Sequence, residues 1–190
     1  MLYAQIHLTL PAWVHDVETT RNYRSDDDKV ALAIELSRRN IEERSGGPFG
    51  AAVFGPDDRL IAVGVNRVLP HFCSVAHAEM MAYMLAQQRT QRARLNRNET
   101  DEAIGPITLA TSSQPCCQCY GATVWAGVDR LLIGARSEDV EELTEFDEGP
   151  LPADWLGELE RRGIMVMRDV QREAARAVLR TYGEAGGERY

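Results

Sequence analysis

Four residues in two short fragments of the sequence have the types and spacing of a catalytic metal site. His77 and Glu79 stand in the fragment His-Ala-Glu, and Cys116 and Cys119 stand in Pro-Cys-Cys-Gln-Cys. One histidine and two thiolates can supply the three protein ligands of a catalytic zinc ion, which keeps its fourth position for water. Glu79 is not needed as a ligand, but a carboxylate beside such a water can take its proton and pass it to a leaving group. The two fragments therefore predict a zinc-dependent hydrolytic site.

The spacing predicts that both fragments lie at the beginnings of helices. Cys116 and Cys119 are three positions apart, so at the start of a helix their sulfur atoms lie on one face. Pro115 suits the first turn of that helix, whose N-terminus favours the thiolate form. On a continuous helix, residues two apart diverge by about 200°. The other helix must therefore begin close to His77 if His77 and Glu79 are to reach one cavity.

Two simpler interpretations of the cysteine pair stay open at this point. Cys116 and Cys119 could be redox thiols, or half of a structural zinc ribbon that stabilises the fold without turnover. A ribbon needs a second pair of ligands, and the remaining histidines are isolated in the sequence. A redox pair leaves His77 and Glu79 unexplained. We interpret Cys117 as a bystander that faces the core.

The composition is that of a globular protein, with 44% hydrophobic and 26% charged residues among 190. The formal net charge of -8 opposes binding to a phosphate backbone, so we expect no nucleic-acid partner. An arginine-rich stretch at residues 89–97 is followed at once by acidic residues, which indicates a solvated connection. Residues 1–20 lack the pattern of a signal peptide, and no apolar run approaches the roughly 18 residues of a membrane span. We expect a cytoplasmic protein without membrane contact.

The hydrophobic pattern predicts strands that alternate with helices after an opening hairpin, as in an α/β sheet covered on both faces. Residues 1–26 are expected to form an N-terminal arm and residues 27–190 one domain. The expected strands are residues 51–54, 60–65, 107–111, 131–135 and 164–167. The expected helices are residues 26–45, 77–88, 117–127, 137–144, 153–162 and 170–182.

The pair His-Ala-Glu and Pro-Cys-x-x-Cys is the motif of zinc deaminases that act on bases. From about residue 27 to 135 the chain resembles the cytidine deaminase-like superfamily, and within it the bacterial guanine deaminases. This closer resemblance rests on five stretches: residues 46–51, 64–66, 120–126, 134–137 and, above all, 145–150 (Glu-Phe-Asp-Glu-Gly-Pro). It implies a three-layer α/β/α sandwich with a central mixed five-stranded sheet. It also implies a homodimer, as family members of this kind are dimers, often with the C-terminal segment crossing to the partner.

The resemblance implies hydrolysis of guanine to xanthine and ammonia. It assigns Zn²⁺ to His77, Cys116 and Cys119, and the main proton transfers to Glu79. Glu148, with Asp147 as the second choice, takes the position of the acidic residue that closes over the substrate and helps to protonate the leaving nitrogen.

Further residues match the substrate-binding positions of the family. Asn66 resembles the amide that recognises the polar edge of the base, although it could simply end a strand. Phe49 and Trp125 resemble the aromatic walls of the pocket, although each could be core. Tyr190 is a candidate for a C-terminal aromatic that reaches the substrate, and Ala78 completes the expected set.

Other functions remain in view. The same zinc chemistry could act on ammeline or another triazine, guanosine, a pterin, cytosine or cytidine. The tRNA adenosine deaminases share the motif, but the net charge disfavours a polyanionic substrate. A different class of function would be an inactive deaminase fold that only binds a ligand, which the presence of Glu79 with three ligands disfavours.

The chain departs from the family pattern beside the cysteines. Gln114 replaces the glutamate usual before Pro115 and removes one charge near the metal.

Overall fold

The sheet is built outward from the predicted hairpin. In the computed structural model, which describes residues 4–190, β1 (Gly50–Phe54) pairs antiparallel with β2 (Leu60–Val65) and with β3 (Thr108–Ser113). From there β3, β4 (Arg130–Ala135) and β5 (Met165–Met167) run parallel, because one helix connects β3 to β4 and two helices connect β4 to β5. The order β2-β1-β3-β4-β5 confirms the mixed five-stranded sheet.

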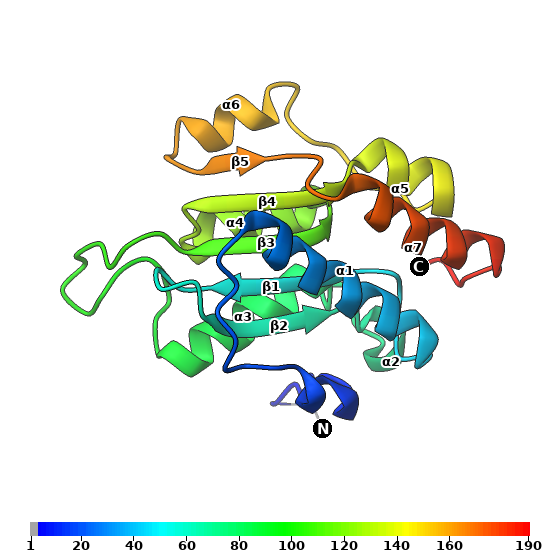
Figure 1. Ribbon diagram of the computed structural model, residues 1–190, viewed down its shortest axis with the longest axis horizontal. Coiled ribbons are helices and arrows are strands. Elements are labelled where there is room, and N and C mark those ends of the chain that lie inside the picture. Colours follow the sequence, from blue (N-terminus) through cyan, green and yellow to red (C-terminus); the bar gives the residue numbers. More distant parts are fainter. Residues whose placement is uncertain (1–3) are drawn as a thin grey trace.

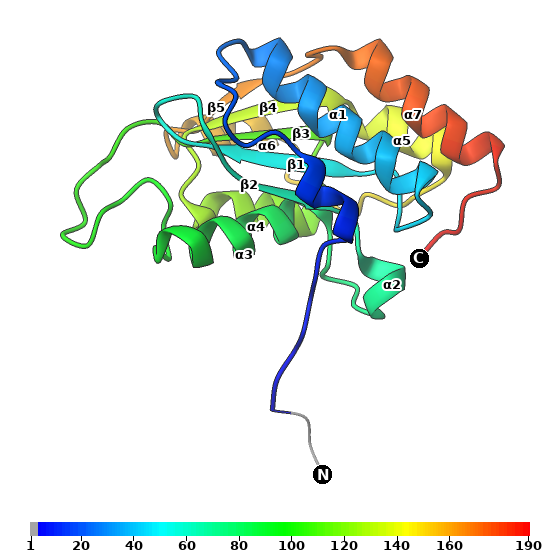
Figure 2. The same ribbon diagram turned by 60° about the horizontal axis from the view of Figure 1, so that its bottom comes forward.

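Helices cover both faces of this sheet and make the predicted three layers (Figures 1 and 2). Along β1, alternate side chains enter different cores: Ala52 and Phe54 pack in one cluster, and Ala51 and Val53 in the other. The first cluster includes residues of α1 (Asp26–Glu42), α5 (Ser137–Thr144) and α7 (Arg172–Glu184). The second includes residues of α3 (Ala78–Thr90), α4 (Cys117–Ala126) and α6 (Trp155–Glu160). The short α2 (Val68–His71) links β2 to α3.

The N-terminal segment packs on α1 before the helix begins. The 3-10 helix η1 (Ala12–Asp16) places Trp13 against the core, under the Arg39 guanidinium at 4.6 Å from the ring centre. Ser25 then caps α1, because its hydroxyl oxygen accepts a hydrogen bond from the Asp28 N–H at 3.0 Å. Figure 2 shows the first described residues, from residue 4 on, reaching away from the body of the molecule before the chain enters η1.

The predicted elements differ from the observed ones mainly at their ends. The helix expected over residues 153–162 is shorter, because Asp154 caps α6 through the Gly157 N–H. The last helix starts two residues late, after Gln171 in a left-handed conformation, and passes through Gly183.

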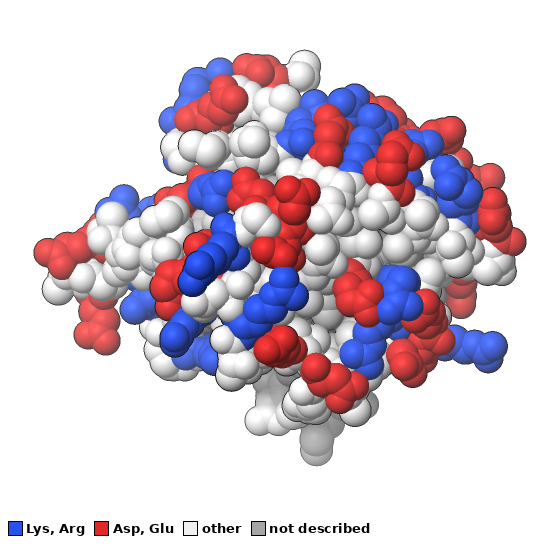
Figure 3. Space-filling model, in the orientation of Figure 1, with Lys and Arg blue, Asp and Glu red and all other residues white. Residues whose placement is uncertain are grey.

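Charged side chains of both signs mix over the face shown in Figure 3, without a continuous basic surface there. Among residues 4–190, no helix combines the length and the apolar character needed to cross a membrane.

Candidate active site

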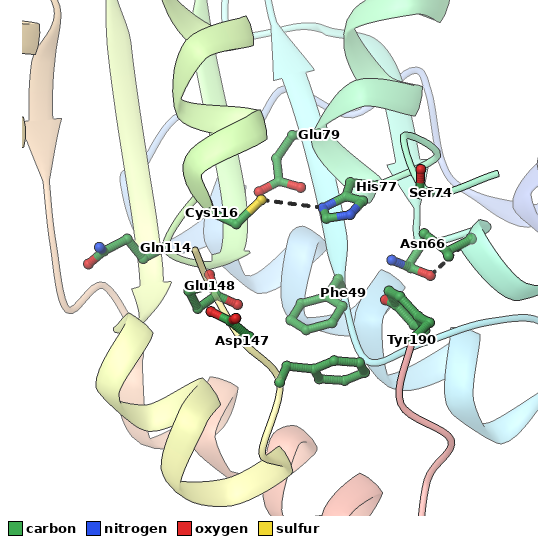
Figure 4. A pocket seen from close by; sticks show the side chains of 12 residues that line it. Phe49, Asn66, Ser74, His77, Glu79, Gln114, Cys116, Asp147, Glu148 and Tyr190 are labelled. Atoms are coloured by element: carbon green, nitrogen blue, oxygen red, sulfur yellow. Dashed lines mark hydrogen bonds between the residues drawn. The ribbon is translucent and has the colours of Figure 1, made fainter. Parts of the chain in front are cut away.

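The predicted metal ligands meet where α3 and α4 begin. His77 is the N-cap of α3, Cys116 is the N-cap of α4, and Cys119 lies in the first turn of α4. His77 Nδ1 lies 3.5 Å from Cys116 Sγ, as Figure 4 shows, and 3.6 Å from Cys119 Sγ. Tetrahedral zinc with ordinary Zn–N and Zn–S bonds separates nitrogen from sulfur by about 3.6 Å. The three side chains therefore fit a zinc ion, as the sequence predicts, and they are the one such group found in the described part of the chain.

The electrostatics of the cysteine pair favour a thiolate. A hydrogen bond from Cys119 lowers the pKa of Cys116 to about 4, against the opposing effect of burial, and His77 contributes in the same direction. The same pairing raises the pKa of Cys119. A thiolate is the form that binds zinc, and the positive end of α4 also stabilises it.

Glu79 lies two residues along α3 and lines the same cavity as His77. This is possible because α3 begins at Ala78, as the spacing required. The Glu79 side chain is buried, which together with the charge of Cys116 raises the pKa of its carboxyl to about 7. A carboxyl group with such a pKa can both accept and return a proton near neutral pH.

A second acidic group enters the cavity from the loop after α5. Glu148 is buried, and in Figure 4 Glu79 and Glu148 lie on either side of Cys116. Burial, with the nearby charges of Cys116 and Glu79, raises the pKa of Glu148 to about 9. Asp147 also lines the cavity, but its carboxylate accepts a hydrogen bond from the Gly149 N–H at 2.8 Å and so holds the turn. Glu148 is therefore the acidic residue of this loop that suits proton donation.

The cavity has a volume of about 220 Å³ and a wall of aromatic rings. Phe49 packs on Phe146 with ring centres 5.4 Å apart, and Phe146 packs on Tyr190 at 4.9 Å. Tyr190 thus reaches the cavity of its own chain. Phe146 was not among the predicted site residues, although it stands inside the stretch that carries the family resemblance. Three further lining residues were also not predicted as substrate contacts: Val68, Ser74 and Gln114.

Asn66 presents a free hydrogen-bond donor to this cavity. Its side chain is 1% exposed, and its Oδ1 accepts a hydrogen bond from the Val68 N–H at 3.2 Å. The Nδ2 atom is buried without a hydrogen-bond partner among the described residues, and in Figure 4 it points into the cavity. A buried donor without a partner costs free energy, which a ligand with an acceptor at this point would recover.

Two predicted substrate contacts lie outside the cavity. Trp125 is 79% exposed on the outer side of α4, because Cys119 and Thr123 occupy the buried side of that helix. The prediction that Trp125 walls the pocket is therefore wrong for a single chain. Ala78 packs in the core between α3 and the sheet and does not line the cavity. Cys117 was expected to face the core, but it is exposed at the start of α4.

Comparison with known proteins agrees with this geometry. Residues 24–135, more than half of the chain, match the cytidine and deoxycytidylate deaminase zinc-binding region. The chain belongs to this deaminase family. The matched residues include all three zinc ligands and Glu79, whereas Glu148 and Tyr190 lie beyond them.

Solved deaminases extend the similarity to nearly the whole chain. The guanine deaminase of Nitrosomonas europaea is 38% identical, with a TM-score of 0.84 over 97% of this chain and 99% of that one. A structure solved in complex with 8-azaguanine is 40% identical, with a TM-score of 0.88 over 95% and 98% of the two chains. A probable cytosine deaminase of Schizosaccharomyces pombe is 31% identical to this chain. The match covers 60% of this chain and 62% of the length of that relative.

Proposed function

We propose that this chain is a zinc-dependent deaminase that converts guanine to xanthine and ammonia, a reaction of purine catabolism. The observation that supports the proposal is one cavity in which Glu79 faces a zinc-competent ligand set and the Asn66 donor faces the space for a base. The near full-length similarity to a guanine deaminase supports guanine as the substrate.

The residues divide the reaction between them. His77, Cys116 and Cys119 would hold a zinc ion, which would supply a water activated for attack near neutral pH. Glu79 accepts the proton of that water and passes it to the ring nitrogen beside the carbon under attack. Glu148, kept protonated by its burial, donates a proton to the amino group so that it leaves as ammonia. The Glu148 carboxylate then takes the proton of the added hydroxyl group, which becomes the carbonyl group of xanthine.

Recognition of the base follows from the other walls. Phe49, Phe146 and Tyr190 enclose a flat ring, and the Asn66 Nδ2 donates to an acceptor on its polar edge. Because Val68 N–H holds the Asn66 oxygen, the amide presents its nitrogen to the cavity. A ring that offers a carbonyl oxygen or an unprotonated ring nitrogen at this point, as guanine does, satisfies the buried donor.

We also propose that the chain works as a homodimer, as the family resemblance implies. Trp125 at 79% exposure and Phe72 at 98% are large apolar side chains that water would otherwise surround. Because Tyr190 lines the cavity of its own chain, exchange of the C-terminal segment is not needed to bring it there. Sedimentation of the wild type and of Trp125→Asp tests this: we expect a dimer, weakened in the variant, and a monomeric wild type would contradict it.

The substrate is tested by ammonia release from a panel of bases. Zinc-loaded protein is mixed with guanine, ammeline, guanosine, a pterin, adenine, cytosine and cytidine. We expect guanine to give the highest kcat/KM. Release from another compound alone would retain the zinc chemistry but contradict the proposed substrate. A protein that binds zinc and releases ammonia from none of them would instead fit an inactive, ligand-binding deaminase fold.

A further inference from the structure

A buried amide on α1 supports the cavity without lining it. Asn40 is fully buried, and its Nδ2 donates to two carbonyl oxygens, that of Gly47 at 2.8 Å and that of Asn66 at 3.0 Å. Its Oδ1 accepts a hydrogen bond from the Ser45 hydroxyl at 2.8 Å. Both donor hydrogens and the acceptor of Asn40 are thus used. A fully satisfied polar group of this kind can fix the backbone that it bonds.

One carbonyl group belongs to Asn66, which lines the cavity, and the other to Gly47, which lies against the lining residue Tyr190. Asn66 directly follows the strand β2 and carries the free donor, and its backbone N–H also bonds the Phe49 carbonyl oxygen at 3.1 Å. Gly47 faces the Tyr190 hydroxyl, which lies 2.9 Å from the position that a Cβ on Gly47 would take. The preceding Gly46 packs so closely on Asn66 that a Cβ there would lie 1.9 Å from the Asn66 carbonyl oxygen. Asn40 therefore joins the turn behind Tyr190 to the backbone of Asn66.

We propose that Asn40 is a positioning residue that sets the direction of the Asn66 donor. The inference rests on the proposed function, in which this donor binds the polar edge of the base. Asn40 fixes the Asn66 peptide from the α1 side, while Val68 N–H fixes the Asn66 side-chain oxygen. Because these two hydrogen bonds already order the Asn66 backbone and side chain, the amide nitrogen loses little conformational freedom when it binds the substrate.

The same network of hydrogen bonds links the N-terminal segment around η1 to the site. The Trp13 indole N–H donates to the Ser45 hydroxyl at 3.0 Å, and this hydroxyl donates to Asn40. Arg67, directly after Asn66, binds the Ser45 carbonyl oxygen through its guanidinium. The segment around η1 thus braces the far end of the network that reaches Asn66.

A double-mutant comparison separates positioning from a loss of stability. We expect Asn40→Ala to raise the KM for guanine about five- to tenfold, the equivalent of one neutral hydrogen bond, while the zinc content stays at the wild-type value. In the background of Asn66→Ala the same change should alter kcat/KM less than about twofold, because the donor that it positions is gone. Ser45→Ala removes the hydrogen bond from the Ser45 hydroxyl to Asn40 and should raise the KM about two- to threefold. This variant replaces Asn40→Ala in the comparison if Asn40→Ala does not fold.

The matched control is Asn96→Ala. Asn96 bonds Asp129 at 2.7 Å and packs near Gly127, at the opposite end of α4 from the zinc ligands. An equal KM increase in this control, or the same effect of Asn40→Ala in both backgrounds, would overturn the proposal.

Crystal structures of the wild type and Asn40→Ala provide a readout that does not need turnover. We expect the Asn66 amide to be displaced or disordered in the variant. If guanine is not a substrate, the proposed function fails while these structures still decide the role of Asn40. An unmoved Asn66 would overturn the positioning inference whatever the substrate.

Discussion

The backbone N–H of Cys117 donates a hydrogen bond to the carbonyl oxygen of Glu148 at 3.0 Å. This bond ties the beginning of α4, where two of the proposed zinc ligands lie, to the loop that carries the second acidic group. The next residue, Gly149, has a φ of +68°, and a Cβ on it would lie 2.6 Å from the Cys117 sulfur. The position of Glu148 therefore depends on a glycine and on the side chain at position 117.

Gly149→Ala should displace Glu148. The added methyl group meets the Cys117 sulfur in a backbone conformation that alanine adopts poorly, so we expect a loss of about 1 kcal/mol in stability. The kcat should fall about tenfold or more, because proton donation depends on the position of the donor. Steady-state kinetics and thermal unfolding measure both. Adding Cys117→Ala removes the clash and should restore part of the kcat; wild-type kinetics in Gly149→Ala would show that Glu148 is not held this way.

The substitution Glu148→Gln should lower activity and raise stability. Because the folded-state pKa of Glu148 is raised from 4.5 to about 9, the folded chain retains a proton between these pH values that the unfolded chain has released. The contribution of this carboxyl group to folding stability is thus most favourable below pH 4.5, and it becomes less favourable as the pH rises towards 9. Because glutamine does not titrate, the free energy of unfolding of the variant should exceed that of the wild type by about 1 kcal/mol or more as the pH rises from 5 to 9. The kcat of the variant should be about 100-fold lower. A stability difference that does not change with pH would contradict the raised pKa.

Zinc removal should lower both activity and stability. A ligand that binds only the folded chain stabilises it by about 2.7 kcal/mol at a hundredfold excess over its Kd. We expect a chelator to abolish turnover and lower the Tm, and added zinc to reverse both. Cys119→Ser should bind zinc weakly, whereas Glu79→Gln should bind it as the wild type does. Full activity in metal-free protein would exclude the zinc chemistry.

Tyr190 should contribute mainly to substrate binding. The Tyr182 hydroxyl donates to the Glu188 carbonyl oxygen at 2.6 Å, Arg189 pairs with Glu145, and Tyr190 packs on Phe146. Removing residues 189–190 should raise the KM for guanine about tenfold by opening the cavity to water. Tyr190→Phe keeps the ring and should change KM less than threefold. Equal effects of the two changes would assign the role to the hydroxyl group instead.

Much of the site could be predicted because its residues are marked by spacing. His77, Glu79, Cys116 and Cys119 require two helix beginnings, and α3 and α4 begin there. Trp125 was misplaced because a matching motif does not say which side of a helix is buried. Asn40 carries no sequence signal, since two of its partners are backbone carbonyl groups that any residue type offers and that only the fold brings together.

The central claim is tested most directly by xanthine formation from guanine, followed by absorbance, with wild type and Glu79→Gln at equal zinc content. Glu79 is a buried carboxyl group that lines the same cavity as the zinc ligands His77 and Cys116. We predict conversion by the wild type and a loss of at least about 1,000-fold in kcat in the variant, within the range for a residue that transfers protons in the reaction. Conversion of guanine at a near-normal rate by Glu79→Gln, or none by the zinc-loaded wild type, would contradict the account.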